Sequence, residues 1–337
     1  MSRTPVHRQV LVTGGAGFIG SHLVDVLLAQ GAAVTVVDDL STGRRSNLDP
    51  AVVAATRSGA GRLETVVARV SEALPAMGSR RFDAIYHLAA AVGVRLVVED
   101  PAASAERNVT ETAAILRFAA AARTPILVAS SSEVYGKGVR SPFREDDDLA
   151  FGPPTVSRWS YGLSKAIDEQ LALAMHRSES LPVTVARFFN TVGPRQRGRW
   201  GMVLPRFVAA AVAGEPLEVH GTGTQVRCFC DVRDVSAALP RLLADAAHHG
   251  RVFNVGTDAP ISIEALAALV IETLGSRSTI RRVPHAAVFG PGFEDLEVRI
   301  PDLARIRSAI GFAPTIPLRQ TIADVAAEMA RAPEVAA

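Results

Sequence analysis

The chain has 337 residues, of which 48% are hydrophobic and 21% are charged, and its formal net charge is +2. No apolar run reaches the roughly 20 residues that a membrane-spanning helix needs, and no basic cluster is dense enough for a nucleic-acid surface. The first ten residues, MSRTPVHRQV, lack the apolar centre of a signal peptide, so we expect a cytoplasmic protein with no membrane and no nucleic-acid partner. The two cysteines, Cys228 and Cys230, lack the second pair that a zinc site needs, and no metal is expected.

The first predicted elements form a βαβ unit over residues 9–38. An apolar run is followed by glycines and then by a helix with Leu23, Val26 and Leu27 on one face. A second run, rich in β-branched residues, ends at Asp38. This order of strand, glycine turn, helix and strand is typical of a nucleotide-binding α/β fold.

The glycines of this unit predict a dinucleotide site. Gly14, Gly17 and Gly20 stand between the strand and the helix, where small residues let the backbone approach a pyrophosphate at the helix N-terminus. Asp38 follows 18 residues after Gly20, near the separation expected of an acid that binds the ribose. A carboxylate there accepts from the ribose hydroxyls and repels a 2′-phosphate, so we predict NAD rather than NADP as the cofactor.

Further strands and helices alternate along the chain. Apolar strands are predicted over residues 83–90 and 125–130, with an alanine-rich helix over residues 108–122 between them. A helix from about residue 161 to residue 176 and a strand over residues 182–189 come next. Alternating elements with fully apolar strands predict an α/β protein with a Rossmann-type, doubly wound parallel sheet.

The composition of the sequence and the pattern of predicted elements change after Asn190. The next stretch is rich in Gly, Pro and Arg, and the remainder of the chain mixes short strands and helices without regular alternation. We therefore predict an NAD-binding domain over residues 1–190 and a smaller α/β domain, mainly for substrate binding, over residues 191–330. This second domain is expected to cap the carboxyl ends of the strands, where open α/β sheets bind ligands.

Tyr161 and Lys165 form a candidate catalytic pair. Their i, i+4 spacing places them on one face of a helix. The chain contains lysine only at Lys137 and Lys165, and a lysine in an otherwise arginine-rich chain points to a use for its titratable amine. An adjacent ammonium and the positive nicotinamide ring would stabilise the phenolate of Tyr161, which would make it a base near neutral pH.

The motifs, in order, resemble a known enzyme family. The glycine motif, Asp38, the HLAA stretch ending at Ala90, Asn108, the SSSEVYG stretch and the Tyr161–Lys165 pair together resemble the extended short-chain dehydrogenase/reductases that modify nucleotide sugars. The resemblance covers nearly the whole chain. It implies a tightly held NAD, a Tyr161 base assisted by Lys165 and Ser131, hydride removal from C4 of the sugar, and a homodimer formed through the helices at residues 108–121 and 161–175. It also implies cofactor contacts from Phe18, Ile19, Leu88, Ala89, Ala90 and Asn108.

The same resemblance supplies the substrate-binding residues. Arginine suits the diphosphate because its planar fork gives paired, charge-assisted hydrogen bonds. His220 stands where many relatives have an aromatic residue that stacks on uracil, which leaves both UDP and dTDP sugars open. The implied substrate contacts are Arg95, Glu133, Asn190, Arg195, His220, Arg227 and Arg299.

The serine tract narrows the reaction. The 4,6-dehydratases resemble S-T-D-E-V-Y-G and need the acid that is replaced here by Ser132; the 4-epimerases resemble S-S-A-T-V-Y-G and have no counterpart of Glu133. The sequence is most similar to UDP-glucuronate decarboxylases, with S-T-S-E-V-Y-G or close to it. Decarboxylation needs a cation for the substrate carboxylate, which we assign to Arg299, and a donor near the C4 oxygen, which we assign to Ser131 and Tyr161. A proton source for C5 is also needed, and Glu133 or a water that it holds is expected to provide it.

The resulting prediction is NAD-dependent decarboxylation of UDP-glucuronate to UDP-xylose, with release of some UDP-4-keto-xylose left open. The alternatives are a UDP-sugar 4-epimerase, a 4,6-dehydratase disfavoured by Ser132, and a protein of another class that binds NAD as a sensor without turnover. The intact set of Tyr161, Lys165 and Ser131 disfavours the sensor, because a sensor has no need for an activated phenol.

Overall fold

The computed structural model describes residues 7–49, 61–78, 80–91, 100–198, 202–289 and 296–331. Its main element is a seven-stranded sheet in which every neighbouring pair of strands is parallel, in the order β11-β6-β5-β4-β1-β2-β3. The strands are β1 (Gln9–Thr13), β2 (Ala33–Asp38), β3 (Arg62–Val67), β4 (Ala84–His87), β5 (Ile126–Ser131), β6 (Val183–Phe188) and β11 (Arg251–Val255). This order confirms the predicted doubly wound fold, with its switch point between β1 and β4.

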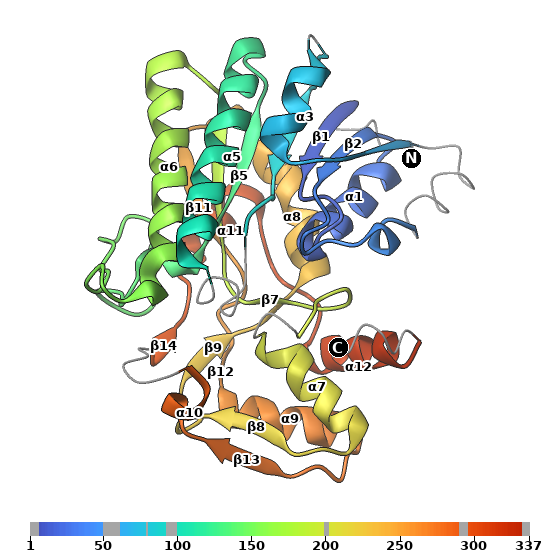
Figure 1. Ribbon diagram of the computed structural model, residues 1–337, viewed down its shortest axis with the longest axis vertical. Helices are drawn as coiled ribbons and strands as arrows, with labels where there is room; N and C mark the ends of the chain where they lie inside the picture. Colours follow the sequence, from blue (N-terminus) through green and yellow to red (C-terminus); the bar gives the residue numbers. More distant parts are fainter. Residues whose placement is uncertain are drawn as a thin grey trace.

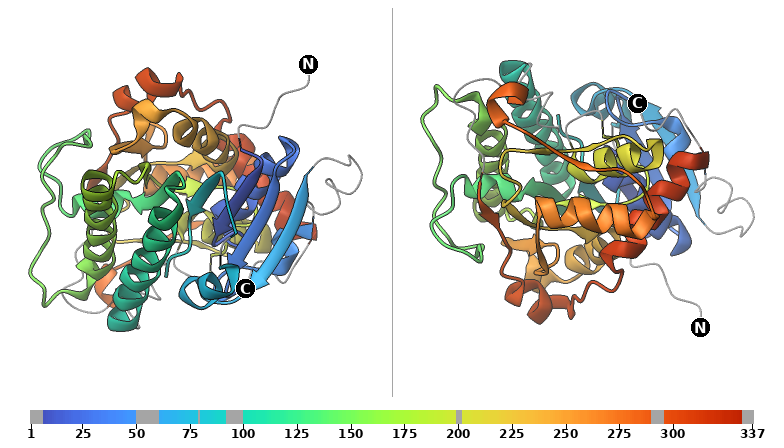
Figure 2. Two further views of the ribbon diagram at one scale, coloured as in Figure 1. Left: turned by 90° about the horizontal axis from the view of Figure 1, so that it is seen from above. Right: turned by 90° about the horizontal axis from the view of Figure 1, so that it is seen from below.

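Helices cover both faces of the sheet, as Figures 1 and 2 show. Because both faces are covered, the inner strands are largely apolar and β4 is buried at every position, whereas the edge strand β3 is mostly exposed. One layer is α1 (Phe18–Ala29), α8 (Val232–Ala244) and α11 (Ala304–Ile310), and the other is α3 (Val70–Met77), α5 (Pro101–Ala122) and α6 (Ser160–Glu179).

Helix α5 begins earlier than the periodic pattern predicted. Pro101 occupies the first turn, where its missing N–H costs nothing, and the Asp100 side chain accepts from the backbone N–H of Ala103 at 3.0 Å. The helix runs beside α6 at one edge of the molecule (Figure 1). The pair brings Asn108 and Thr112 of α5 near the face of α6 that carries Ser164 and Asp168.

A smaller lobe follows β6 and lies at one end of the sheet (Figure 1). Its helices bury residues such as Phe207, Leu266 and Ile322 in a separate core. The elements are β7 (Thr191–Val192), α7 (Val203–Ala213), β8 (Leu217–His220), β9 (Val226–Cys228), β10 (Cys230–Asp231), β12 (Pro260–Ser262), α9 (Ile263–Leu274), β13 (Ile280–Val283), α10 (His285–Phe289), β14 (Val298–Arg299) and α12 (Leu318–Arg331). Short 3₁₀ turns complete the chain: η1 (Arg45–Asn47), η2 (Ser132–Tyr135), η3 (Ser157–Trp159) and η4 (Ala246–His248).

The chain returns from this lobe to the sheet. Strand β11 pairs with β6, with Val255 opposite Phe188, and α8 and α11 cover the same face as α1. We therefore propose that the cofactor domain consists of residues 1–190 together with these later segments, and that the substrate domain takes the rest of residues 191–330. Within the described residues, no helix is both long and apolar enough to cross a membrane.

Candidate active site

A cavity of about 510 Å³ opens where the sheet meets the smaller lobe. The turns that follow β1, β2, β4, β5 and β6 line it from the sheet side, because the carboxyl ends of parallel strands meet at one edge. Arg95 was also predicted for the site, but it lies outside the described residues. Every other predicted site residue lines the cavity: Gly14, Gly17, Phe18, Ile19, Gly20, Asp38, Leu88, Ala89, Ala90, Asn108, Ser131, Ser132, Glu133, Tyr161, Lys165, Asn190, Arg195, His220, Arg227 and Arg299.

The glycine turn after β1 is packed too tightly for side chains at two positions. Gly14 has φ +72°, and a Cβ there would lie 2.6 Å from the backbone N of Ala89. A Cβ on Gly20 would lie 2.1 Å from the carbonyl oxygen of Gly14. The turn therefore needs glycine both for its own shape and for the seating of α1, whose N-terminus faces the cavity.

Asp38 closes the far side of this turn. Its Oδ2 accepts from the N–H of Ala16 at 2.9 Å and its Oδ1 from the N–H of Leu40 at 2.8 Å, which fixes the carboxylate at the end of β2. Nearby, Nε and Nη2 of Arg44 are buried without a hydrogen-bond partner among the described residues. An oriented acceptor, free buried donors and a glycine cradle at a helix N-terminus fit the ribose and phosphate groups of NAD.

Asn108 holds the loop after β4 against α6. Its Oδ1 accepts from the N–H of Ala91 at 2.7 Å, and its Nδ2 donates to Oγ of Ser164 at 3.2 Å. The side chain is buried, so both bonds are shielded from water. Asn108 therefore shapes the wall formed by Leu88, Ala89 and Ala90.

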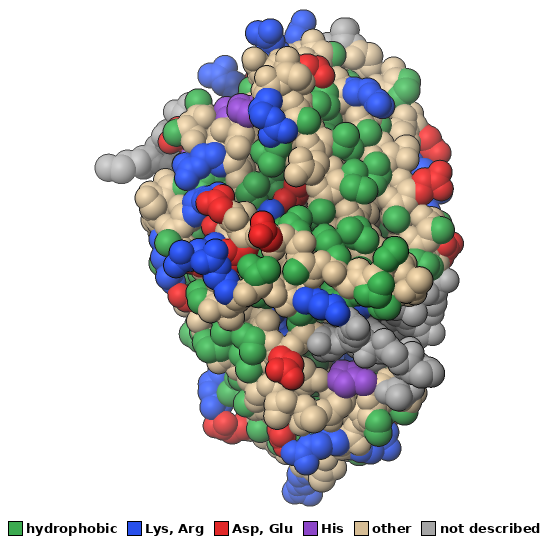
Figure 3. Space-filling view, turned by 90° about the vertical axis from the view of Figure 1, so that its left-hand side faces the viewer, with side chains coloured by type: hydrophobic (Ala, Val, Ile, Leu, Met, Phe, Trp, Pro, Cys, Tyr) green, Lys and Arg blue, Asp and Glu red, His purple; other side chains and the backbone are tan. Residues whose placement is uncertain are grey.

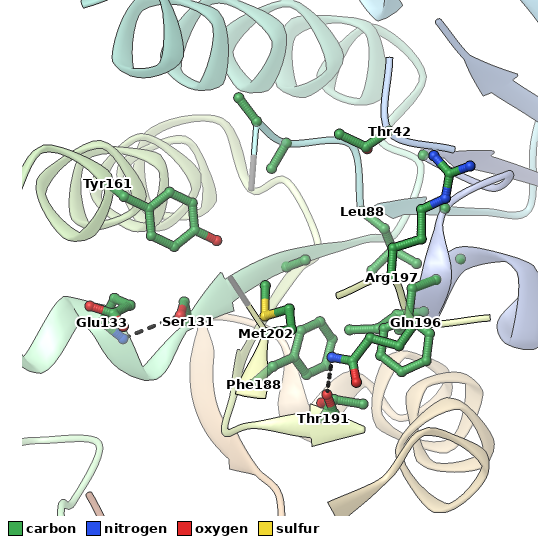
Figure 4. A pocket seen from close by; sticks show the side chains of 18 of the residues that line it. Thr42, Leu88, Ser131, Glu133, Tyr161, Phe188, Thr191, Gln196, Arg197 and Met202 are labelled. Atoms are coloured by element: carbon green, nitrogen blue, oxygen red, sulfur yellow. Dashed lines mark hydrogen bonds between the residues drawn. The ribbon is translucent and has the colours of Figure 1, made fainter. Parts of the chain in front are cut away.

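Tyr161 projects from α6 into the cavity, and Ser131 and Glu133 line the same side of that cavity (Figure 4). Burial raises its pKa above the usual range; Glu133 and Asp168 add to the rise, and the hydroxyl of Ser131 opposes it. Lys165 meanwhile donates from Nζ to Oδ2 of Asp168 at 2.7 Å. In the protein by itself the ammonium is thus paired with Asp168, and the expectation that Lys165 and the nicotinamide ring together make Tyr161 a base near neutral pH stays a prediction.

The serine tract turns the chain from β5 into η2. Ser131 caps this turn, since its Oγ accepts from the N–H of Glu133 at 3.2 Å. Ser132 is buried and its Oγ lies 3.4 Å from Nη1 of Arg299. Ser130 points the other way and donates to Oε1 of Glu169 at 2.5 Å, so it supports the fold. The three adjacent hydroxyls thus have three different neighbours.

Glu133 sits between two arginines. Its Oε1 accepts from Nη1 of Arg299 at 2.7 Å and its Oε2 from Nη1 of Arg158 at 2.6 Å. The Glu133 side chain is 15% exposed, and those of Arg158 and Arg299 are 10% and 7% exposed. Burial opposes ionisation, but Arg299 and Arg158 outweigh it and lower the pKa of Glu133 to about 2.

This ion-pair arrangement predicts how stability depends on pH. The folded-state pKa of Glu133, about 2, lies below the ordinary value near 4.3, so the pairs stabilise the fold fully above the ordinary value and cease to do so as the pH falls through the folded value. We expect the gap in melting temperature between wild type and Glu133→Gln to narrow as the pH falls from about 5 toward 2. Calorimetry over this range tests it; a gap that stays constant would contradict the assignment.

The residues predicted to contact the substrate lie in different parts of the cavity wall. Arg227 is buried on β9 and donates to the carbonyl oxygen of Val226 at 2.9 Å. Asn190 donates from Nδ2 to the carbonyl oxygen of Cys228 at 3.3 Å. Arg195 also lines the cavity, but its guanidinium pairs with Asp25 of α1 at 2.7 Å, so it joins the two lobes.

His220 lies at the far end of the cavity in a cluster of basic residues. Its Nε2 is 3.0 Å from Nη2 of Arg206, and burial together with Arg206 lowers its pKa to about 4. Gln225 Nε2 lies 2.8 Å from Nε2 of His285 in the same wall. The predicted contact of His220 with the nucleotide base stays a prediction, and the structure adds Arg206, Gln225 and His285 beside it.

The sequence analysis assigned no role to Arg158, although it lies close to the Tyr161–Lys165 pair in the chain. The structure brings it to Glu133, which is 25 residues away along the chain. The available signal was its position three residues before Tyr161, at the turn that starts α6. Arg206, Gln225 and His285 were missed as well, because nothing in the local sequence marks them.

Comparisons with known proteins agree with this geometry. The chain is 34% identical over 316 residues to the UDP-N-acetyl-α-D-glucosaminuronate decarboxylase of Bacillus cytotoxicus, covering 93% of this chain and 95% of that one. It is 34% identical over 312 residues to UDP-glucuronic acid decarboxylase 2 of Arabidopsis thaliana, covering 93% of this chain and 66% of the plant protein. The dTDP-glucose 4,6-dehydratase DesIV of Streptomyces venezuelae, solved with NAD bound, superposes with a TM-score of 0.84 at 28% identity, over 97% of this chain and 98% of that one. The profile of one family matches residues 10–256, and the chain belongs to this NAD dependent epimerase/dehydratase family.

Proposed function

We propose that the protein decarboxylates UDP-glucuronate through a 4-keto intermediate, with NAD as the cofactor, and gives UDP-xylose. The observation that carries this proposal is the placement of Arg299 and Arg158 around Glu133, beside Tyr161 in one cavity. A pair of buried guanidinium groups next to the catalytic phenol suits a sugar that carries a carboxylate. The similarity to two sugar-acid decarboxylases supports the same reading.

The chain's own residues account for the first half of the reaction. NAD, when bound, supplies the hydride acceptor at C4 and a positive charge that favours loss of the Tyr161 proton. Tyr161 takes the proton from the C4 hydroxyl, and Ser131 donates a hydrogen bond to the developing ketone oxygen. The ketone is then β to the C6 carboxylate, so carbon dioxide leaves while its bonding electrons move into an enolate.

We propose that Glu133 is not itself the acid in this mechanism. Its pKa of about 2 means that the carboxyl group is ionised at neutral pH and has no proton to give. Of the two proton sources considered from the sequence, the one that remains is a water held by Glu133. Arg299 orients the substrate carboxylate until it leaves, and Glu133 orients the water that protonates C5. Return of the hydride from the reduced cofactor would then convert the ketone to the alcohol, with Tyr161 giving its proton back to the C4 oxygen, and this step would yield UDP-xylose.

The residues of the site disfavour each of the rival activities: one residue that a dehydratase needs is missing, and others are present that an epimerase or a sensor does not need. A dehydratase needs a carboxylic acid to protonate the departing hydroxyl. Ser132, which contacts Arg299 at that position, has only a weakly acidic hydroxyl group. An epimerase needs no charged set around C6, whereas three charged side chains, Glu133, Arg158 and Arg299, stand beside Tyr161. A sensor without turnover has no use for Tyr161, Lys165 and Ser131 in one cavity.

A second substrate is favoured by one comparison. The Bacillus cytotoxicus relative acts, by its name, on UDP-N-acetyl-α-D-glucosaminuronate, and the chain covers 95% of its length. This sugar has the same C6 carboxylate, so the chemistry at C4 to C6 is identical. The two candidates differ at C2, where the amide replaces a hydroxyl.

Incubation with NAD and each sugar nucleotide tests the proposal. We expect carbon dioxide and a UDP-pentose from UDP-glucuronate, measured by released gas and mass spectrometry. If only UDP-N-acetylglucosaminuronate were turned over, the proposed decarboxylation would stand, but the proposed substrate would be replaced by this sugar nucleotide. Conversion of UDP-glucose to UDP-galactose, with UDP-glucuronate untouched, would replace decarboxylation by epimerisation.

Glu133→Gln is expected to slow the steps after oxidation of C4. The amide cannot hold the water with the same charge, and it leaves Arg158 and Arg299 without their shared anion. NADH or the keto sugar should therefore accumulate, which absorbance at 340 nm and mass spectrometry would reveal. Loss of the initial oxidation as complete as in Tyr161→Phe would give Glu133 a different role.

We also propose a homodimer formed through α5 and α6. Figure 3 shows hydrophobic side chains gathered on the face where these helices lie. Leu163 and Ile167 of α6 are 36% and 47% exposed, one turn apart. Light scattering of wild type and Ile167→Asp tests this: a dimer mass that falls to the monomer mass in the variant supports the interface, and an unchanged mass contradicts it.

A further inference from the structure

The partner of the catalytic lysine is a buried carboxylate. Lys165 and Asp168 are three residues apart on α6, and their side chains are 2% and 0% exposed. The two groups are 2.7 Å apart and shielded from solvent, so their attraction is strong and holds the ammonium in place. Asp168 plays no part in the proposed chemistry, so its place beside Lys165 calls for a separate explanation.

Buried polar residues from three other elements form a series of contacts that leads from Asp168 to the sheet. Thr112 of α5 lies close enough to lower the pKa of the Asp168 carboxyl, against the larger effect of burial, which raises it. Thr112 Oγ1 is in turn 3.1 Å from Nε2 of His87 on β4, whose Nδ1 is 2.7 Å from Oγ1 of Thr13 on β1. The chain of contacts fixes the carboxylate relative to the sheet and the glycine turn.

The charge of Asp168 is only partly compensated. Oδ2 binds Lys165, but Oδ1 is buried and makes no close hydrogen bond within the described residues. Glu133, the other carboxylate that acts on Tyr161, is bound by two arginines. Removing Asp168 would therefore both release the ammonium and delete a negative charge near the phenol.

We propose that Asp168 is a positioning residue for the catalytic pair: it anchors the Lys165 ammonium through a buried ion pair and restrains proton loss from Tyr161. This inference rests on the proposed role of Tyr161 as the base. The other ionisable groups around the pair are His87 from β4, Glu133 from η2 and Glu169 on α6 itself. Burial and Lys165 lower the pKa of His87 to about 3, so it is neutral; Glu169 is bound by Arg187 at 2.7 Å. Of these groups, Asp168 is the one that binds the catalytic lysine.

Tyrosinate absorbance measures this restraint without any substrate. The chain has three tyrosines. Tyr86 and Tyr135 are present in both wild type and Tyr161→Phe, so their absorbance cancels when the two spectra are subtracted. In the NAD-saturated protein, subtraction of Tyr161→Phe spectra isolates the titration of Tyr161. We expect Asp168→Asn to move that titration to lower pH by about one unit or more, and Asp168→Glu, which keeps the charge, to stay near wild type.

The outcomes separate a positioning role from a purely structural one. A midpoint for Tyr161 that is unchanged or higher in a folded Asp168→Asn protein would overturn the proposal. Asp168→Ser removes the same charge with a smaller side chain and decides the matter if the asparagine variant does not fold. The ascending limb of the pH profile for NADH formation, which reports proton loss from the Tyr161 base, should shift in parallel with the absorbance. If wild type leaves UDP-glucuronate unreacted, the proposed substrate fails, but the absorbance titration still tests Asp168.

Discussion

Tyr161→Phe is expected to slow oxidation of the sugar at C4 by roughly 100- to 10,000-fold, the usual contribution of a positioned general base. The variant keeps the ring and loses only the hydroxyl that takes the C4 proton. NAD affinity should change little, because the glycine turn and Asp38 remain intact. Single-turnover formation of NADH, followed at 340 nm, measures the step directly.

A second buried tyrosine provides the control. Tyr86 of β4 is fully buried, and its hydroxyl has no hydrogen-bond partner among the described residues. Tyr86→Phe therefore removes one phenol oxygen from the same domain without removing a bond, and its oxidation rate should match that of wild type. If Tyr161→Phe retained more than about a tenth of the wild-type rate, another group would have to be the base.

Arg299→Gln is expected to reduce turnover of UDP-glucuronate roughly 10- to 100-fold, with NAD affinity within about twofold of wild type. A hydrogen bond to a charged group contributes about 1.5–3 kcal/mol, and each 1.4 kcal/mol corresponds to a factor of ten. Arg299 belongs to β14 of the smaller lobe, away from the cofactor turn. Steady-state kinetics with the purified sugar nucleotide, together with calorimetric titration of NAD, separate the two effects.

Arg158→Gln is the matched comparison, since it removes the other guanidinium bound to Glu133. We expect a smaller loss of turnover, because Arg158 acts on the substrate through Glu133. Equal losses in the two variants would mean that both arginines serve to hold Glu133. Equal losses of turnover and NAD affinity in Arg299→Gln would instead assign Arg299 to the fold.

The doubly wound sheet could be predicted because its strands are apolar runs separated by helical periodicity. Strand β11 was not among the predicted strands, since it returns to the sheet only after a passage through the smaller lobe. That return depends on the packing of α8 and α11 against α1, a tertiary effect with no local signature.

The site was predictable where its residues lie in short motifs, and less so where it depends on contacts between distant residues. The sequence placed Arg299 in the site by resemblance, but its bond to Glu133 joins residues 166 positions apart. The pairing of Lys165 with Asp168 was missed for a different reason. The i, i+4 spacing places Lys165 and Tyr161 on one face, but it does not say which anion the ammonium binds. An acid three residues after Lys165 was the signal that could have identified Asp168.

The ion-pair arrangement around Glu133 also has a consequence for substrate choice. Two guanidinium groups share one carboxylate, so the buried set carries one positive charge in excess. A sugar with a carboxylate at C6 would bring this enclosed set to neutrality, whereas a sugar with a neutral hydroxymethyl group would leave the excess unbalanced in a poorly solvated place. Glu133 also keeps both cations in position before any substrate arrives, so little side-chain ordering is left for the binding step. The site would thus select sugar acids over neutral sugars by the charge of the C6 group, even though the two kinds of sugar differ little in size.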